Sequence, residues 1–313
     1  MDTLFYERLK TLLKEEQILV NEPLKAHTTF KIGGPADYYV IADDVDQVRQ
    51  IIFCCKLAKM PYFIIGNGSN LLFADEGYRG VIIRLAESAH PVRVIADGDS
   101  LEVEADAGIL LSKFANQVCK AGYTGFEFAT GIPGTLGGAV FMNAGAYGGE
   151  IKDCIISADV LDETGKVVTL SKEELKLGYR SSAIQGSNYI VLSAKFSFVR
   201  GDLEEILEKS TDFNRQRREK QPLEYPSAGS MFKRPVGYFA GKLIMDAGLR
   251  GYRVGDAMIS EKHCGFVVNA GNATAKDVLQ LIKEVQDIVF EKFGVKIETE
   301  VRFIEEQGGC KSE

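Results

Sequence analysis

The chain has 313 residues, of which 45% are apolar and 26% are charged, a composition that supplies a full core and argues against intrinsic disorder. Its length suggests two domains. The formal net charge of −7 excludes a general electrostatic attraction to nucleic acid or to an anionic membrane surface, so any anionic ligand must be bound by local groups.

The first ten residues, MDTLFYERLK, have no apolar run behind a basic start. We therefore expect no signal peptide and a cytoplasmic protein. The first predicted helix covers Thr3–Glu16, because four leucines recur roughly on one of its faces: Leu4, Leu9, Leu12 and Leu13.

From about residue 28 the pattern becomes strand-like, with short helices between the strands. The predicted strands in this part are Ala36–Ala42, Tyr62–Ile65, Val81–Leu85, Val92–Ala96 and Leu101–Ala105. The last two flank Asp97-Gly98-Asp99, which indicates a hairpin. Helices are predicted at Val45–Lys59 and at Leu110–Ala121, where Gly122 ends the second.

A turn of small and polar residues, Gly66-Asn67-Gly68-Ser69-Asn70, follows a buried-looking strand. Small residues let backbone N–H groups approach a ligand, and successive N–H groups can form an anion-binding concavity. Leu71 stands where G-x-G-x-x-G requires its third glycine, so the turn does not support a Rossmann dinucleotide site. A plain tight turn is the alternative to a binding loop.

The segment Phe128–Gly149 is uncharged over 22 residues and has the length of a membrane span. It contains seven glycines and few large aliphatic residues, so we reject that interpretation. No Lys or Arg occurs from Ala121 through Ile151, so a phosphate here would need backbone N–H groups, with a helix start as a further candidate. A glycine-rich packing seam is the alternative, but the density of glycines favours a ligand.

Three strands follow, at Ile155–Asp162, Val167–Leu170 and Tyr189–Phe198. Gly201 then precedes a highly charged helix, Leu203–Lys220. We place the domain boundary there, which gives a first domain at 1–201 with its core at about 28–200, and a second at 202–313. The second domain is predicted to be a smaller α+β unit with three main elements: strand Gly265–Asn269, amphipathic helix Asp277–Phe293 after the Thr274 cap, and strand Val295–Ile304.

Several common motifs are missing. The six cysteines form no C-x-x-C pair and the three histidines give no zinc-type cluster, so we expect reduced cysteines and no metal. There is no G-x-S-x-G elbow and no Walker A pattern. The basic cluster Arg215, Arg217, Arg218 and Lys220 is offset by nearby glutamates, which favours a solvated helix face, although two of these side chains could hold one diphosphate.

Six short segments, in their order along the chain, resemble the UDP-N-acetylenolpyruvoylglucosamine reductase family. They are Gly66-Asn67-Gly68-Ser69-Asn70-Leu71, Gly131-Ile132-Pro133-Gly134, Asn143-Ala144-Gly145, Gly178-Tyr179-Arg180, Ala228-Gly229-Ser230-Met231-Phe232 and Glu300-Val301-Arg302. The resemblance implies the α+β class, with an FAD-binding PCMH/VAO-type domain followed by a smaller substrate-binding domain. It also implies that FAD is bound and that NADPH donates hydride. The implied reaction reduces UDP-N-acetylglucosamine enolpyruvate to UDP-N-acetylmuramate in peptidoglycan precursor synthesis.

The resemblance also assigns residue roles by position. It implies that Ser230, Arg180 and Glu300 are catalytic and that Lys220 binds substrate phosphate. The implied FAD-binding residues are Gly66, Asn67, Gly68, Ser69, Asn70, Thr130, Gly131, Ile132, Pro133, Gly137, Gly138, Asn143, Ala144, Gly145 and Arg217. A carboxyl at Glu300 would help directly only if it is protonated, which requires a raised pKa.

Two positions depart from the family pattern. Arg234 stands where some members have Asn, and Thr299 where Pro often precedes the motif's glutamate. The separation of about fifty residues between Arg180 and Ser230 resembles the shorter subclass, which lacks an inserted tyrosine loop. Two alternative functions stay open: another PCMH/VAO-type FAD oxidoreductase acting on an alcohol or sugar, and a non-catalytic nucleotide-sugar-binding module. We expect a monomer, because no heptad pattern stands out.

Overall fold

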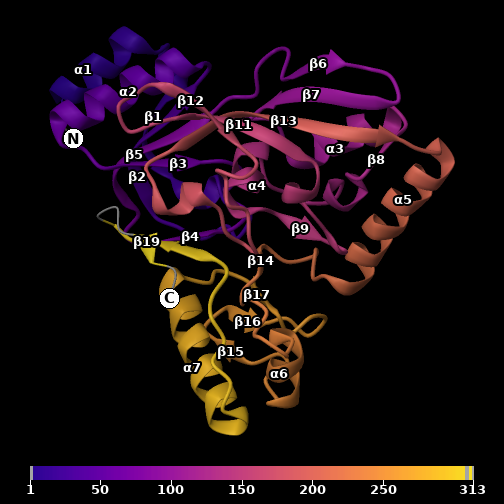
Figure 1. The fold of residues 1–313 in the computed structure, drawn as a ribbon. Coiled ribbons are helices and arrows are strands. Elements are labelled where there is room, and N and C mark those ends of the chain that lie inside the picture. The colour runs from indigo at the N-terminus through magenta and orange to yellow at the C-terminus, as the bar shows by residue number, and fades with distance from the viewer. Residues whose placement is uncertain (1–2, 307–309, 312–313) are drawn as a thin grey trace.

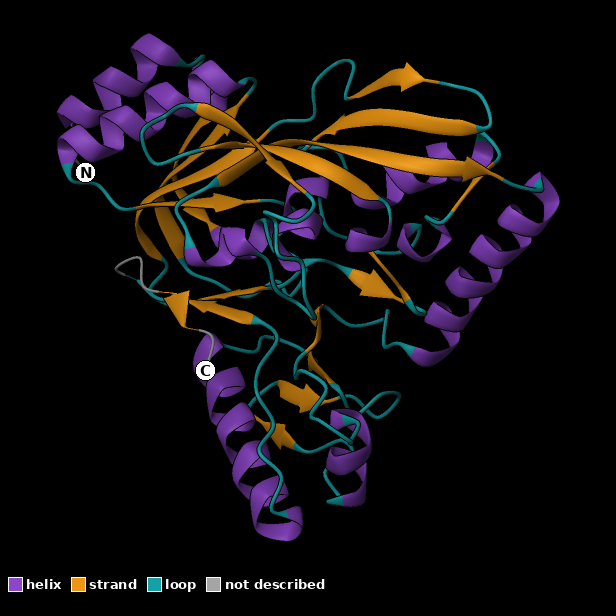
Figure 2. Ribbon diagram, viewed as in Figure 1, coloured by secondary structure: helices purple, strands orange, loops and turns teal. Residues whose placement is uncertain are grey.

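Helices and strands are mixed along the whole chain, as Figures 1 and 2 show. The structure is a computed structural model that describes residues 3–306 and 310–311, with side chains through residue 306. Two sheets form the N-terminal two thirds, and a smaller sheet with two helices forms the C-terminal part (Figure 1). The expected α+β class is confirmed.

The first sheet has the strand order β1-β2-β5-β3, with β2 and β3 both parallel to β5 and β1 antiparallel to β2. Successive side chains point to opposite faces of a strand. Tyr38 and Val40 therefore pack under the two N-terminal helices with Leu9 and Ile51, whereas Tyr39 packs on the opposite face. The elements are α1 (Thr3–Leu12), β1 (Ile18–Pro23), β2 (Pro35–Ala42), α2 (Val45–Ala58), β3 (Tyr62–Ile65) and β5 (Tyr78–Leu85).

The second sheet is antiparallel, with the order β12-β11-β13-β7-β6 and β8 paired to the end of β13. One face carries an aromatic core in which Phe114 of α3 and Phe126 pack against Phe196 and Phe198 of β13. The elements are β6 (Val92–Ala96), β7 (Ser100–Asp106), α3 (Leu111–Lys120), β8 (Tyr123–Thr124), α4 (Leu136–Met142), β11 (Ile155–Leu161), β12 (Val167–Ser171) and β13 (Ile190–Arg200).

The C-terminal part contains the sheet β14-β17-β16-β15, packed on α7 through Val278, Leu281 and Val285. Helix α7 begins with a capping box between Thr274 and Asp277. The elements are β14 (Ser227–Ser230), α6 (Ala240–Asp246), β15 (Arg253–Val254), β16 (Ala257–Ile259), β17 (Phe266–Asn269) and α7 (Ala275–Phe293).

The C-terminal part is joined to the N-terminal part at two points. Strand β18 (Arg302–Ile304) pairs in parallel with β4 (Leu71–Phe73), and β19 (Cys310–Lys311) pairs with β18, so that β4 belongs to a separate sheet with β18 and β19. The Asp75 carboxylate accepts hydrogen bonds from the first two amides of α7, those of Ala275 at 2.7 Å and Lys276 at 3.1 Å. An acidic group at a helix N-terminus is also favoured by the helix dipole.

Helix α5 (Leu203–Lys220) follows β13 and runs beside the second sheet toward the C-terminal part (Figure 1). It packs on α3 and on the short 3-10 helix η3 (Glu127–Ala129). The predicted boundary at residues 201 and 202 therefore falls between β13 and a helix that contacts the first domain. It stays a prediction.

Most predicted elements are observed, with differences at their ends. The strand predicted at Val295–Ile304 is wrong over most of its length: only Arg302–Ile304 forms a strand, because the preceding residues bridge to the C-terminal part only at Phe232–Thr299. The first helix ends at Leu12, before the short helix η1 (Glu15–Gln17). The remaining short elements are η2 (Leu24–Ala26), β9 (Gly145–Ala146), β10 (Gly149–Glu150), η4 (Ile151–Asp153) and η5 (Ala183–Gly186).

Other expectations concern groups of side chains. The five cysteines whose side chains are described are buried and form no disulfide; the side chain of Cys310 lies outside the description. Among the described residues, no cluster of His, Cys, Asp or Glu has the arrangement of a metal site. In the same part of the chain, no helix combines the length and the apolar content needed to cross a membrane.

Candidate active site

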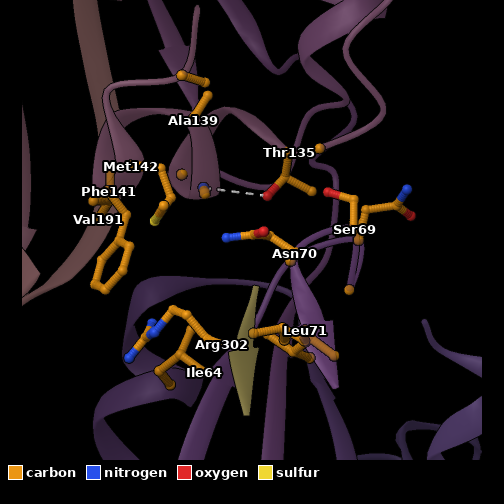
Figure 3. A pocket seen from close by; sticks show the side chains of 18 of the residues that line it. Ile64, Ser69, Asn70, Leu71, Thr135, Ala139, Phe141, Met142, Val191 and Arg302 are labelled. Carbon is orange, nitrogen blue, oxygen red and sulfur yellow. Dashed lines mark hydrogen bonds between the residues drawn. The ribbon is translucent and has the colours of Figure 1, made fainter. Parts of the chain in front are cut away.

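A cavity of about 810 Å³ is lined by both N-terminal sheets and by the C-terminal part. This size is within the usual range for sites that bind small molecules and cofactors. Figure 3 shows it from close by, with Ser69, Asn70 and Thr135 on one side and Phe141 and Val191 on the other. The apolar wall comes from the end of β3, from α4 and from β13.

The turn between β3 and β4, residues 66–70, lines this cavity. Gly68 has a φ of +60°, and a Cβ there would lie 2.2 Å from the His27 carbonyl oxygen, so the turn requires glycine at this point. No described group accepts a hydrogen bond from the amides of Asn67, Gly68, Ser69 or Asn70. These four successive N–H groups are therefore available to an anionic ligand.

The glycine-rich segment also lines the cavity, beside the glycine turn, and contains the helix α4, which starts at the Thr135 cap. The first amides of α4 are not available to a phosphate. Those of Leu136 and Gly137 donate to the carbonyls of Ile109 and Ala107 at 2.9 Å, and that of Gly138 donates to Thr135 Oγ1 at 3.4 Å. The sequence left the helix start as a candidate phosphate donor, but its first amides are already hydrogen-bonded within the protein.

The predicted residues divide into two groups. Those that line the cavity are Gly66, Asn67, Gly68, Ser69, Asn70, Ile132, Pro133, Gly137, Gly138, Ala144, Gly145, Arg180, Arg217, Ser230 and Glu300. Four others, Thr130, Gly131, Asn143 and Lys220, are not among its lining residues. Their roles toward a ligand stay predictions.

Three of these four residues do not line the cavity but hydrogen-bond to segments that neighbour or form its wall. The Thr130 hydroxyl accepts hydrogen bonds at 3.1 Å from Ser210 and Asn214 of α5, and the Gly131 carbonyl accepts one from Arg217. Asn143, fully buried at the end of α4, donates to the Gly178 carbonyl at 2.8 Å. The exposed Lys220 lies one residue before Gln221, which lines the cavity.

Arg180 and Glu300 are brought together by the fold. The Arg180 side chain donates to Glu300 Oε1 from Nε at 2.6 Å, and to the Gly145 carbonyl from Nη2 at 3.0 Å. The Arg180 backbone has a φ of +52°, in a turn closed by the Gly178–Ser181 bridge. A bulky residue in the left-handed region is uncommon and typically occurs where the surrounding structure holds it for function.

The chain around Glu300 joins the glycine turn to the strand that carries Ser230. The Glu300 amide donates to the Met231 carbonyl at 2.8 Å, and its carbonyl accepts from Asn70 Nδ2 at 3.2 Å. Burial raises the pKa of the Glu300 carboxyl, while the charges of Arg180 and Lys233 oppose that shift. The raised pKa agrees with the requirement for a protonated carboxyl.

Ser230 is the last residue of β14 and is half-buried at the same cavity. Its hydroxyl makes no hydrogen bond to any described residue. The cavity therefore presents a hydroxyl, a guanidinium and a carboxyl from three separate segments.

Arg217, on α5, is a cation without a carboxylate partner among the described residues. Its Nη1 donates to the Gly131 carbonyl, and its Nε is buried without a hydrogen-bond partner. Burial lowers the pKa of this guanidinium, and the neighbouring Tyr147 opposes the shift. A buried unsatisfied donor beside a cavity fits an anionic ligand.

The sequence analysis assigned no role to the residues of the apolar wall, nor to Arg302, although Arg302 stands in the motif Glu300-Val301-Arg302. Phe63, Ile64, Phe141, Met142 and Arg302 all line the cavity. Closeness in sequence to predicted site residues could have indicated some of them. Phe63 and Ile64 lie shortly before the glycine turn, and Arg302 is two residues after Glu300. Phe141 and Met142 had no comparable signal, because the glycine-rich segment that contains them was not predicted to include a helix.

Two family models match the chain. One, described as an FAD binding domain, matches residues 36–171. The other, described as the C-terminal domain of UDP-N-acetylenolpyruvoylglucosamine reductase, matches residues 221–304. The matched segments contain the glycine turn and Ser230 with Glu300, respectively.

Relatives with nearly the same length carry the same description. The UDP-N-acetylenolpyruvoylglucosamine reductase of Lachnoclostridium phytofermentans is 56% identical over 98% of this chain and 99% of its own. The reductase of Alkaliphilus oremlandii is 52% identical over 96% and 98%. A crystal structure of UDP-N-acetylenolpyruvylglucosamine reductase from Thermus caldophilus matches with a TM-score of 0.75 and 37% identity, covering 91% of this chain and 97% of that one. The resemblance inferred from six motifs is confirmed: this chain belongs to the UDP-N-acetylenolpyruvoylglucosamine reductase family.

Proposed function

We propose that this protein reduces UDP-N-acetylglucosamine enolpyruvate to UDP-N-acetylmuramate, with FAD as its resident cofactor and NADPH as the hydride donor. The observation that carries the proposal is the meeting of Arg180, Glu300 and Ser230 at one cavity with the glycine turn. Membership of the reductase family and the match of residues 36–171 to an FAD binding domain support the cofactor.

The residues at the cavity fit FAD on two observations. The free amides of Asn67–Asn70 and the unsatisfied Nε of Arg217 suit a pyrophosphate. The wall of Phe63, Ile64 and Phe141 suits a flat, largely apolar ring system. We propose that the predicted FAD-binding residues that line the cavity hold the cofactor, and that Thr130, Gly131 and Asn143 keep their backbone in place. Bound FAD would supply the hydride chemistry, first accepting from NADPH and then donating to the substrate.

The proposed role of Arg180 is to bind the carboxylate of the enolpyruvyl group. Hydride addition at the methylene carbon leaves negative charge on the adjacent carbon and on its carboxylate. A fixed guanidinium that becomes more strongly bound as this charge develops stabilises the transition state more than the substrate. Its hydrogen bond to the Gly145 carbonyl and its constrained backbone keep Arg180 from moving away.

Glu300 and Ser230 are proposed to complete the reaction. A protonated Glu300 donates a hydrogen bond to the developing enolate, which its raised pKa permits. Ser230 delivers the proton to the carbon next to the carboxylate. A hydroxyl is a weak acid, so this step requires a strongly basic carbanion or enolate.

Lys220 is proposed to contact substrate phosphate. Its exposed ammonium group donates a hydrogen bond to Gln216 Oε1 at 3.0 Å, one turn earlier on α5. An ammonium group has three donors, so others are left for a ligand that enters from that end of the cavity. The monomeric state is likewise a proposal, and its test is the mass of the protein in solution.

One spectroscopic experiment tests the reaction. The purified protein is expected to be yellow, to bleach with NADPH in the absence of oxygen, and to regain its colour with the enolpyruvyl nucleotide. Oxygen consumption with sugar alcohols would support the alternative oxidase. A colourless protein that binds UDP-sugars unchanged would support the non-catalytic module.

A further inference from the structure

Arg302 and Glu300 both line the cavity. The residue between them, Val301, is buried in the core of the C-terminal part. Val301 lies at a bend immediately before β18, and the residues on both sides of it reach the cavity. A carboxyl-bearing residue and a guanidinium-bearing residue therefore line the cavity from one short segment of the chain.

The Arg302 side chain is held in an apolar setting. Its backbone N–H donates to the Asn70 carbonyl at 3.1 Å, and the strand register places it opposite Leu71. Its guanidinium lies 4.8 Å from the ring centroid of Phe141 and 5.9 Å from that of Phe63. Figure 3 shows Arg302 between Ile64 and Phe141. Such contacts with aromatic rings attract a cation and hold it in place.

We propose that Arg302 contacts the flavin ring and preferentially stabilises its reduced, anionic form, and so raises the reduction potential of the bound flavin. This inference rests on the proposed function and on the placement of the ring against Phe63, Ile64 and Phe141. Two-electron reduction puts a negative charge on the pyrimidine part of the ring at neutral pH. A planar guanidinium can share that charge, and the apolar wall strengthens the attraction because it lowers the local dielectric.

If Arg302 instead contacted the pyrophosphate of FAD, its replacement would have a different effect on the reduction potential. The pyrophosphate has the same charge in oxidised and reduced FAD. A phosphate contact would therefore change the affinity for both forms equally and leave the potential where it is. Comparing the two redox forms thus separates the roles.

The test uses the full-length protein with FAD added to saturation, as wild type, Arg302→Gln and Arg302→Lys. The first readout is a titration with sulfite, monitored by the loss of flavin absorbance. The sulfur lone pair forms a bond to flavin N5 and the displaced electron pair leaves a negative charge at N1, so sulfite affinity reports how well the site stabilises that charge. The second is the midpoint potential, poised with dithionite and a reference dye. The third is the affinity for oxidised FAD. Arg253→Gln is the control, since Arg253 is exposed on β15.

We expect Arg302→Gln to weaken sulfite binding at least tenfold. We also expect it to lower the two-electron potential, by about 30 mV for each tenfold loss in the preference of the protein for reduced over oxidised flavin. Arg302→Lys should fall between it and wild type, and Arg253→Gln should match wild type. An unchanged potential in both Arg302 variants overturns the inference, and so does a loss of oxidised FAD that saturation does not overcome. None of the three readouts needs NADPH or the nucleotide, so failure of the proposed reaction would be seen separately.

Discussion

The Nε atom of Arg180 lies 2.6 Å from Oε1 of Glu300, although the two residues are 120 positions apart in the chain. Their side chains are 20% and 14% exposed, so the pair is largely shielded from water at the edge of the cavity. A shielded contact of this kind fixes both groups in position, and loss of Glu300 would leave the Arg180 guanidinium largely buried without this partner. The proposed mechanism depends on this geometry.

Replacing Arg180 with alanine is expected to lower the rate of flavin reoxidation by the enolpyruvyl nucleotide about 10²–10³-fold or more, the range found when one group that stabilises a developing oxyanion is removed. Stopped-flow absorbance after prior reduction measures this step directly. Arg180→Lys keeps the charge but not the two-point contact with Glu300 and Gly145, and should recover only part of the rate. Near-normal turnover in the alanine variant would remove Arg180 from the mechanism.

Replacing Ser230 with alanine is expected to separate the two half-reactions. Flavin reduction by NADPH needs no proton from this hydroxyl and should proceed near the wild-type rate, whereas reoxidation by the nucleotide should collapse. Both rates come from the same stopped-flow experiment, and the first serves as the control for folding and FAD content. Equal loss of both half-reactions would indicate a structural role for Ser230.

The raised pKa of Glu300 predicts a pH dependence. Because burial favours the neutral acid, the protonated form persists at pH values where an ordinary glutamate is ionised. The rate of flavin reoxidation should therefore be highest below the raised pKa and fall as the pH rises through it. Glu300→Gln, which stays neutral, should be slower but should lack this decline. If the decline survives in Glu300→Gln, another group is titrating.

Much of the fold was predictable because local signals and tertiary packing agree. Helix α7 has a capping box at Thr274, an apolar stripe and Gly294 at its end, where φ is +66°. Strand β17 is short and fully buried, and its first three residues are apolar. In such segments the sequence pattern and the three-dimensional environment favour the same structure.

The parts that could not be predicted depend on contacts distant in sequence. Helix α4 contains two glycines, which disfavour a helix, but Gly137 is needed because a Cβ there would lie 2.9 Å from the Cβ of Ala107. The pairing of Arg180 with Glu300 depends on the return of the C-terminal strand to β4. No local pattern in either segment predicts this contact. Only the family resemblance predicted that the two residues belong to one site.

Gly68→Ala is expected to destabilise the glycine turn by about 1–3 kcal/mol, the usual cost of a strained backbone conformation, because its φ is +60° and the new Cβ would meet the His27 carbonyl oxygen. The FAD affinity should fall with it, since the amides of the turn would shift. Gly98→Ala is the matched control, because Gly98 has no neighbouring atom within 4 Å of an added Cβ. Thermal unfolding with and without FAD checks both effects. Equal behaviour of the two variants would contradict the close approach at Gly68.

Arg217→Met should affect the protein without FAD and the FAD complex in opposite ways. The buried Nε of Arg217 has no partner and burial lowers the pKa of its guanidinium, so the charge is held at a cost when no anion is bound. Replacing it with an apolar side chain should leave the melting temperature of the FAD-free protein unchanged or raise it. The rise in melting temperature on adding FAD should shrink, because that rise depends on the ligand concentration relative to Kd. The neighbouring Arg218 is exposed, and Arg218→Met should change neither quantity. A variant at Arg217 that is less stable without FAD, yet gains as much from FAD as wild type, would show that this guanidinium supports the fold instead of the cofactor.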